Sequence, residues 1–137
     1  MSKPPFEPSV AGRIAFFFGP IAGALVSVVS LRRSGHPLRS GKILRWTLLV
    51  AAVMAVAILL LPDALGRLFG IAAEITFYSV YPRLQKQEFD LWQSANPGLL
   101  PLNGWRAIGW GFLGLFLFFA IAMVIIIPLM MLFPSLQ

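Results

Sequence analysis

The sequence contains no cysteine, only one histidine and only five acidic residues among its 137 positions. Without cysteine, neither a disulfide framework nor a thiolate metal site is possible. His36 is the single imidazole, whereas a catalytic zinc ion takes about three protein ligands. Glu88 and Asp90 are two positions apart, so on a helix their side chains point in different directions and form no acid–base pair. We therefore expect a protein that is not an enzyme and that binds no metal or cofactor.

Charged residues are scarce as a whole, and apolar residues take their place. Hydrophobic residues make up 58% of the chain and charged residues 12%, with a mean hydropathy of +0.84. Soluble domains contain about 45–50% and about 25%, respectively. The composition therefore predicts an integral membrane protein. No internal repeat divides the sequence, so we expect one transmembrane domain over residues 1–137.

The formal net charge is +6 at pH 7. In a soluble chain this excess of positive charge would suggest nucleic acid. Beside membrane spans, however, Lys and Arg normally report orientation, because they resist translocation. We therefore predict no nucleic-acid partner, and the positions of the basic residues indicate how the chain crosses the membrane.

Three uncharged runs are long enough to cross the hydrocarbon core. The first, residues 14–31, has 18 residues, which at about 1.5 Å each just span a core of about 30 Å. It exceeds the usual signal-peptide core of about 7–15 residues, so we expect it to be retained. The second, residues 46–62, begins with Trp46 at an interfacial position. The third, residues 107–133, is the longest at 27 residues, and Pro128 is expected to end or kink it.

The segment 63–81 is ambiguous because it is mostly apolar but carries Arg67 and Glu74. If it lies on the membrane surface, the chain crosses three times, and the Lys and Arg residues divide five against six between the two sides. If it crosses, there are four spans and the basic residues divide eight against three, because the clusters at 32–45 and 83–106 share one side. The positive-inside rule favours four spans, with three spans and an interfacial helix at 63–81 as the alternative.

We therefore predict an all-α four-span bundle with spans at residues 14–31, 46–62, 64–81 and 107–133. Its cytoplasmic loops are 32–45 and 82–106, its N-terminal tail 1–12 is flexible, and both termini face the outer side.

The second cytoplasmic loop is expected to contain a short helix over residues 82–95. Pro82 ends the third span and suits the first turn of this helix, and Lys86 and Asp90 are spaced for an i,i+4 pair. Phe89 and Trp92 on this helix are candidate docking residues for a partner, the alternative being that the segment packs against its own bundle.

Small residues mark two helix faces on which backbones can approach closely, since packing rather than hydrophobicity drives helix association in lipid. These helix-packing candidates are Gly19, Gly23 and Ser27 in the first span and Ala107, Gly111 and Gly114 in the last. Their spacing does not distinguish contacts within one chain from contacts in a homo-oligomer. Pro20, near the start of the first span, is expected to cause a simple bend.

Glu74 is the one acidic residue placed well inside a proposed span, and ionisable groups at that depth are functional candidates by default. Arg67 lies seven positions earlier on the same helix face, about 10 Å away along the axis, which is too far for a direct pair. Together they form the candidate intramembrane polar site. Two interpretations of Glu74 remain open, a hydrogen-bonded structural group and an ion or proton pathway.

The basic residues of the first cytoplasmic loop are candidates for contact with anionic lipid headgroups, at about 1 kcal/mol each near a charged leaflet. They are Arg32, Arg33, Arg39, Lys42 and Arg45. Their part in fixing orientation explains them equally well.

Three stretches share sequence patterns with known proteins. Residues 15–23 contain aromatic-Gly-Pro-x-Ala-Gly, residues 30–35 fit Asn-x-Arg-x-x-Gly with Ser30 in place of Asn, and residues 105–109 read Trp-x-Ala-x-Gly. In these patterns the chain resembles a group of small bacterial membrane proteins to which no activity is attached. The resemblance implies the bacterial inner membrane and supports four spans.

Because no residues predict chemistry, we expect an accessory or structural subunit of a larger membrane complex, in contact with lipids and other membrane subunits. The alternative is a small oligomeric transporter, or an ion or proton pathway, in which Glu74 is the coupling residue.

Overall fold

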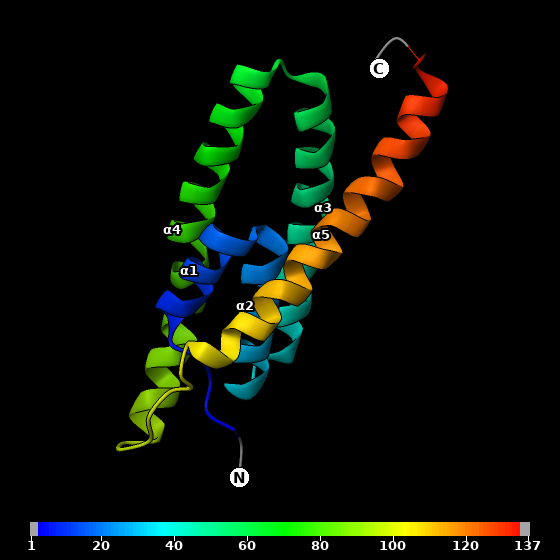
Figure 1. Cartoon of the computed structure of the whole chain (residues 1–137). Helices are drawn as coiled ribbons and strands as arrows, with labels where there is room; N and C mark the ends of the chain where they lie inside the picture. The colour runs from blue at the N-terminus through cyan, green and yellow to red at the C-terminus, as the bar shows by residue number, and fades with distance from the viewer. Residues whose placement is uncertain (1–2, 135–137) are drawn as a thin grey trace.

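The structure, a computed structural model, describes residues 3–134, and its regular elements within that range are helices. They are α1 (Pro8–Phe18), α2 (Pro20–Arg33), α3 (Pro37–Leu60), α4 (Asp63–Ala95) and α5 (Trp105–Leu132), shown in Figure 1. The all-α prediction is confirmed. Proline is the first residue of α1, α2 and α3, where its missing N–H breaks no helical hydrogen bond.

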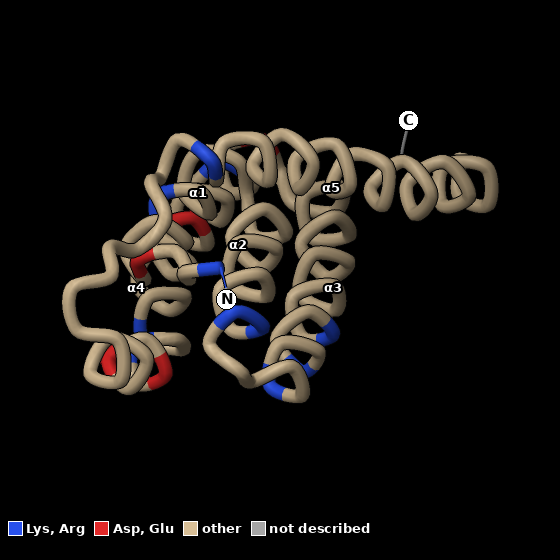
Figure 2. The backbone as a smooth tube through the Cα atoms, turned by 90° about the horizontal axis from the view of Figure 1, so that it is seen from below, with Lys and Arg blue, Asp and Glu red and all other residues tan. Residues whose placement is uncertain are grey.

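The helices surround a short central one. In Figure 1, α3 and α5 run from the lower to the upper end, and α4 runs back down. α1 and α2 form a hairpin whose turn lies about halfway up the molecule. Seen end-on in Figure 2, α2 lies in the middle, and it packs against all four other helices. Ten of its 14 residues are buried, so the core lies in the lower half of the molecule.

The prediction of one continuous span over residues 14–31 is wrong, because the chain turns back between α1 and α2. Gly19 has φ 90° and ψ 175°, a conformation that glycine alone adopts readily, and Pro20 then starts α2. At about 1.5 Å per residue the two helices are about 16 and 21 Å long, so neither crosses a core of about 30 Å. Pro20 therefore follows a reversal of the chain and not a simple bend.

The N-terminal segment is ordered against this hairpin, and the prediction of a flexible tail over 1–12 is wrong for the described residues. Phe6 is 1% exposed, and its carbonyl accepts a hydrogen bond from Ser30 Oγ at 3.0 Å. The carbonyl of Pro5 accepts from the N–H of Leu102 at 2.9 Å. The segment before α1 therefore joins the end of α2 to the loop before α5.

The predicted span 64–81 and the predicted short helix 82–95 are one continuous helix, α4, so Pro82 does not end a helix as expected. Because Pro82 has no N–H, it cannot donate to the Tyr78 carbonyl one turn earlier. α1 packs against this site through Gly12, at which a Cβ atom would lie 2.6 Å from the Tyr78 carbonyl oxygen. Glycine therefore allows α1 to lie directly on the proline turn.

The loops are shorter than predicted. Residues 34–36 alone separate α2 from α3, in place of a loop over 32–45, and residues 96–104 separate α4 from α5, in place of a loop over 82–106. α3 begins nine residues before the predicted span at 46, since its first residue is Pro37. α5 agrees with the predicted span 107–133 and continues through Pro128. α5 ends at the upper end of Figure 1, whereas the segment before α1 lies at the lower end, unlike the expected arrangement with both termini on one side.

Candidate functional site: a groove between α3 and α4

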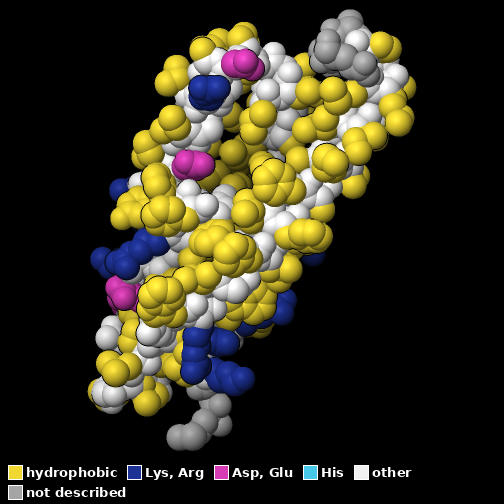
Figure 3. All heavy atoms as spheres, in the orientation of Figure 1, with side chains coloured by type: hydrophobic (Ala, Val, Ile, Leu, Met, Phe, Trp, Pro, Cys, Tyr) yellow, Lys and Arg dark blue, Asp and Glu magenta, His cyan; other side chains and the backbone are white. Residues whose placement is uncertain are grey.

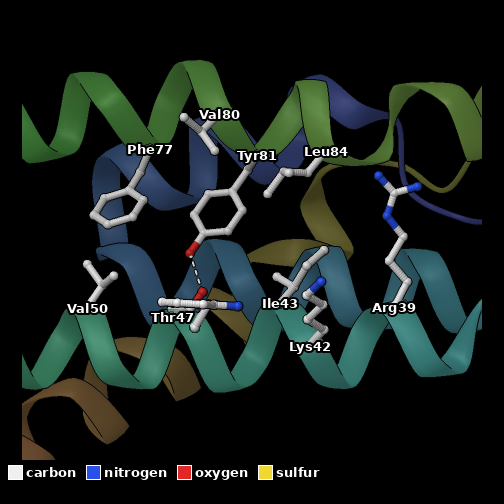
Figure 4. Close-up of a pocket in the computed structure, with 10 residues that line it drawn as sticks. Arg39, Lys42, Ile43, Thr47, Val50, Phe77, Val80, Tyr81 and Leu84 are labelled. Carbon is white, nitrogen blue, oxygen red and sulfur yellow. Dashed lines mark hydrogen bonds between the residues drawn. The ribbon is translucent and has the colours of Figure 1, made fainter.

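A groove of about 360 Å³ runs between α3 and α4. Figure 4 shows the residues that line it. Arg39 and Lys42 stand at one end of it, whereas Val50 and Phe77 stand at the other, and the walls between them are largely apolar. Trp46, which is 60% exposed, is also part of the lining. The groove is therefore an open apolar channel with a basic end.

Tyr81 forms the inner wall of the groove and ties three helices together. Its hydroxyl is 2.9 Å from Thr47 Oγ1 on α3 and donates to the carbonyl of Pro20 on α2 at 2.8 Å. Tyr81 is 2% exposed and Thr47 is 5% exposed. The Pro20 carbonyl belongs to the first turn of α2, immediately after the Gly19 break. One phenol therefore fixes the turn of the hairpin to both walls of the groove.

The basic end of the groove contains an ion pair between Arg39 on α3 and Glu88 on α4. The Glu88 side chain is 6% exposed, whereas that of Arg39 is 45% exposed. The pair joins the first turn of α3 to the second half of α4 at the basic end of the groove. Sequence spacing gave no signal for this pair, because its members are 49 positions apart and on different helices.

Below Tyr81 the helices bury a polar layer. Gln85, one turn after Tyr81, is 1% exposed, and its Nε2 donates to the Pro8 carbonyl on α1 at 3.4 Å. Ser27 on α2 is fully buried, one turn after Gly23, at which a Cβ atom would lie 2.9 Å from the Tyr81 ring. α2 and α4 run in the same direction (Figure 1), so Ser27 and Gln85 lie at a similar level. Within residues 3–134, Ser27 Oγ and Gln85 Oε1 are buried without a hydrogen-bond partner, so the bond from Gln85 to Pro8 is the one that this layer contributes.

Glu74 lies in the upper half of α4, away from this layer. It is half-buried and has no hydrogen bond or ion pair to another side chain within residues 3–134. Gly70 and Gly66, one and two turns earlier on the same stripe, are also half-buried, and a Cβ atom on either would meet nothing within 4 Å. Arg67 is exposed and does not pair with Glu74. The structure therefore does not bring the predicted polar site together.

The small residues that were predicted to pack helices do so within one chain, except at Gly19. A Cβ atom at Gly114 would lie 2.2 Å from the Cα atom of Ala22 on α2, and one at Gly111 would lie 2.8 Å from the Phe18 ring. Ala107 is fully buried. Gly23 and Ser27 face Tyr81 and the polar layer, as described above. A Cβ atom at Gly19 would meet nothing within 4 Å, so this glycine packs against no other helix and instead permits the chain reversal.

Phe89 and Trp92 pack inside the molecule. Each is 8% exposed, and their ring centroids are 5.9 Å apart. Their burial conflicts with the predicted docking of a partner on these two side chains and agrees with the alternative that the segment packs against its own bundle.

The five basic residues proposed for lipid contact differ in their surroundings. Arg32 donates to Ser40 Oγ at 3.4 Å, and Arg33 donates to the Pro4 carbonyl at 3.3 Å. Arg39 pairs with Glu88, whereas Lys42 and Arg45 are exposed and form no ion pair in the part of the chain that the structure describes. Lys42 is therefore the free basic group at the groove.

Two helices, α3 and α5, are long and apolar enough to cross a membrane. Figure 3 shows hydrophobic side chains over most of the upper part of the visible face, with most Lys and Arg side chains in its lower half. Comparison of the chain with protein-family models, with curated proteins and with solved structures gives no match. The arrangement of the helices and of their charges therefore carries the functional argument.

Proposed function

We propose that this protein is a non-enzymatic subunit of a membrane protein complex, inserted through three crossing helices and one re-entrant hairpin. α3, α4 and α5 cross, whereas α1 and α2 enter from the basic end and return to it. This arrangement differs from both arrangements that the sequence suggested, because the segment 63–81 crosses while the first apolar run does not.

The direction of α3 and α5 supports a crossing α4. Both helices run from the lower to the upper end of the molecule (Figure 1), and both have the length and composition of a membrane span. A chain that crosses twice in the same direction must return between the two crossings. α4 is the segment that returns, so its first half crosses in spite of Arg67 and Glu74.

The distribution of basic residues supports the re-entrant hairpin. If the hairpin returns to its starting side, most of the basic residues lie at one end of the bundle, the end that Figure 2 views. They belong to the N-terminal segment, α1, the α2–α3 region, the second half of α4 and the start of α5. Arg13 belongs to this set because it lines a surface depression together with Glu7 and Asn103. Ten Lys and Arg residues then share one side, and Arg67 is the single one near the other. This division follows the positive-inside rule better than eight against three.

The stripe formed by Gly66, Gly70 and Glu74 is the observation that supports a subunit role. Close approach of a second backbone requires small residues, and the chain's own helices leave both glycines uncontacted. Glu74 at membrane depth requires a hydrogen-bond donor, and no side chain within residues 3–134 supplies one. A transmembrane helix of a partner with a donor opposite Glu74 would satisfy both requirements.

Cysteine labelling tests the topology without background, because the chain has no cysteine of its own. We expect a membrane-impermeant maleimide to label Asp63→Cys from the outer side of intact cells. Lys3→Cys and His36→Cys should react only after permeabilisation. If Lys3→Cys were labelled from outside while His36→Cys stayed protected, residues 14–31 would cross the membrane once, and the re-entrant hairpin would be wrong.

Purification in mild detergent tests the subunit role. We expect a stoichiometric membrane partner that is retained by the wild type and cross-links to a photoreactive amino acid at position 70. Gly70→Ile should lose the partner. Gly109→Ile is the matched control, since Gly109 is an exposed helical glycine of α5 whose Cβ would also meet nothing within 4 Å. A pure homo-oligomer that supports Glu74-dependent flux in liposomes would instead establish a transporter.

A further inference from the structure

We infer that the groove between α3 and α4 is a binding site for one anionic phospholipid, with an acyl chain in the channel and the headgroup phosphate at Lys42. The inference rests on the membrane placement proposed above, but not on the existence of a protein partner. It narrows the general attraction of five basic residues for lipid to one site with a defined occupant.

The shape and lining of the groove match an acyl chain. Along α3 the lining extends from Arg39 to Val50, which is about 16 Å at about 1.5 Å per residue. Phe77 and Val80 on α4 close the apolar part of the opposite wall. The Tyr81 and Thr47 hydroxyls are both used in the hydrogen bonds described above, so neither offers an unpaired donor to a ligand. The apolar walls of the channel therefore suit hydrocarbon.

The charge at the groove's basic end selects an anionic headgroup. Arg39 is neutralised by Glu88, whereas Lys42 is exposed and has no ion pair within residues 3–134. Trp46 lies one turn above Lys42, where an indole at the membrane–water interface is expected. A phosphate at Lys42 with its acyl chain passing Trp46 would therefore lie at the ordinary depth of a lipid headgroup. A zwitterionic lipid has the same acyl chain, but an unpaired lysine contributes less to its binding free energy than to that of an anionic lipid.

Native mass spectrometry of the detergent-purified protein tests this site, with phosphatidylglycerol and phosphatidylethanolamine of identical acyl chains as probes. We expect one phosphatidylglycerol per chain to bind more tightly than phosphatidylethanolamine. Lys42→Gln should weaken phosphatidylglycerol binding about fivefold, which is the factor expected for one basic group at a membrane surface. Val50→Trp, at a position 36% exposed, should fill the channel and weaken both lipids without unfolding the protein, as checked by circular dichroism.

Lys86→Gln is the matched control. Lys86 is exposed on α4 in the same basic region but does not line the groove, so its loss should change binding less than twofold. Equal binding of the two lipids, or an equal effect of Lys42→Gln and Lys86→Gln, would overturn the site. Both outcomes are independent of the proposed partner. Failure of the membrane placement itself would appear separately, as protein in the soluble fraction of lysed cells.

Discussion

At the scale of single residues, the molecule depends on side chains that join helices far apart in the sequence. Tyr81 joins α2, α3 and α4 through one hydroxyl, and Glu88 joins α4 to α3 through Arg39. The first is a hydrogen bond between neutral groups, and the second is an ion pair in which one partner is nearly buried. In both cases the buried group has a partner on another helix, whereas Glu74 has none within residues 3–134.

Tyr81→Phe should lower the free energy of unfolding by about 1–2 kcal/mol, because it removes the hydrogen bonds of Tyr81 to Thr47 and to the Pro20 carbonyl at almost unchanged volume. Thermal or SDS-induced unfolding in detergent, followed by circular dichroism, measures the change. Tyr78→Phe is the control, since Tyr78 is 49% exposed, and it should change stability by less than about 0.5 kcal/mol. Equal effects of the two substitutions would show that the Tyr81 hydroxyl contributes nothing.

At the scale of elements, the α1–α2 hairpin is the unit that distinguishes this fold from a simple bundle of spans. Its turn requires one glycine conformation at Gly19, and its ends are held together by Ser30 and the Phe6 carbonyl. The two helices also differ in their surroundings, because α2 is enclosed by the other four helices whereas α1 covers the outside of α4 and α2. The hairpin is therefore a part of the core as well as a connection.

Gly19→Ala should destabilise the protein by about 1–3 kcal/mol, because a side chain at φ 90° and ψ 175° is strained even though space is available. The same unfolding measurement in detergent applies. Gly41→Ala is the matched control: Gly41 lies inside α3, and its Cβ would likewise meet nothing within 4 Å. It should leave stability unchanged or raise it slightly, since alanine is the better helix former. A neutral Gly19→Ala would mean that the reversal does not need the glycine conformation.

At the scale of the whole molecule, packing and charge gather at the same end. The buried hydrophobic cluster draws on the hairpin, the N-terminal segment and the neighbouring parts of α3, α4 and α5. The other end consists of apolar helices whose large side chains are exposed, including Phe116 and Val124 on α5. In a bilayer those side chains contact lipid or a partner, so they should contribute little to the stability of the chain by itself.

The same substitution at the two ends should therefore have different effects. Val26→Ala, at a fully buried position in α2, should cost about 1–2 kcal/mol because it leaves a cavity in a packed core. Val124→Ala, at a position 72% exposed in α5, should change stability by less than about 0.5 kcal/mol. Midpoints of unfolding in detergent give both values. A loss at Val124 as large as at Val26 would place part of the stabilising core in the outer end of the bundle.

The sequence by itself determined the helical class, the long apolar helix near 107–133 and, apart from Gly19, the small residues at which helices meet. These properties depend on composition and on spacing within one segment, which a local pattern records. Lys and Arg positions also favoured a crossing at 63–81, which stays a prediction, because the helices long and apolar enough to cross within residues 3–134 are α3 and α5.

The tertiary structure alone decided that residues 14–31 turn back at Gly19, that Pro82 lies inside α4 and that Glu88 is buried while Phe89 and Trp92 face inward. A Gly-Pro pair permits a bend as well as a reversal, and a proline both begins and interrupts helices, so neighbouring segments decide between these outcomes. Burial of Glu88 depends on Arg39 arriving from another helix. The groove between α3 and α4 exists for the same reason, since its two walls meet when the chain folds.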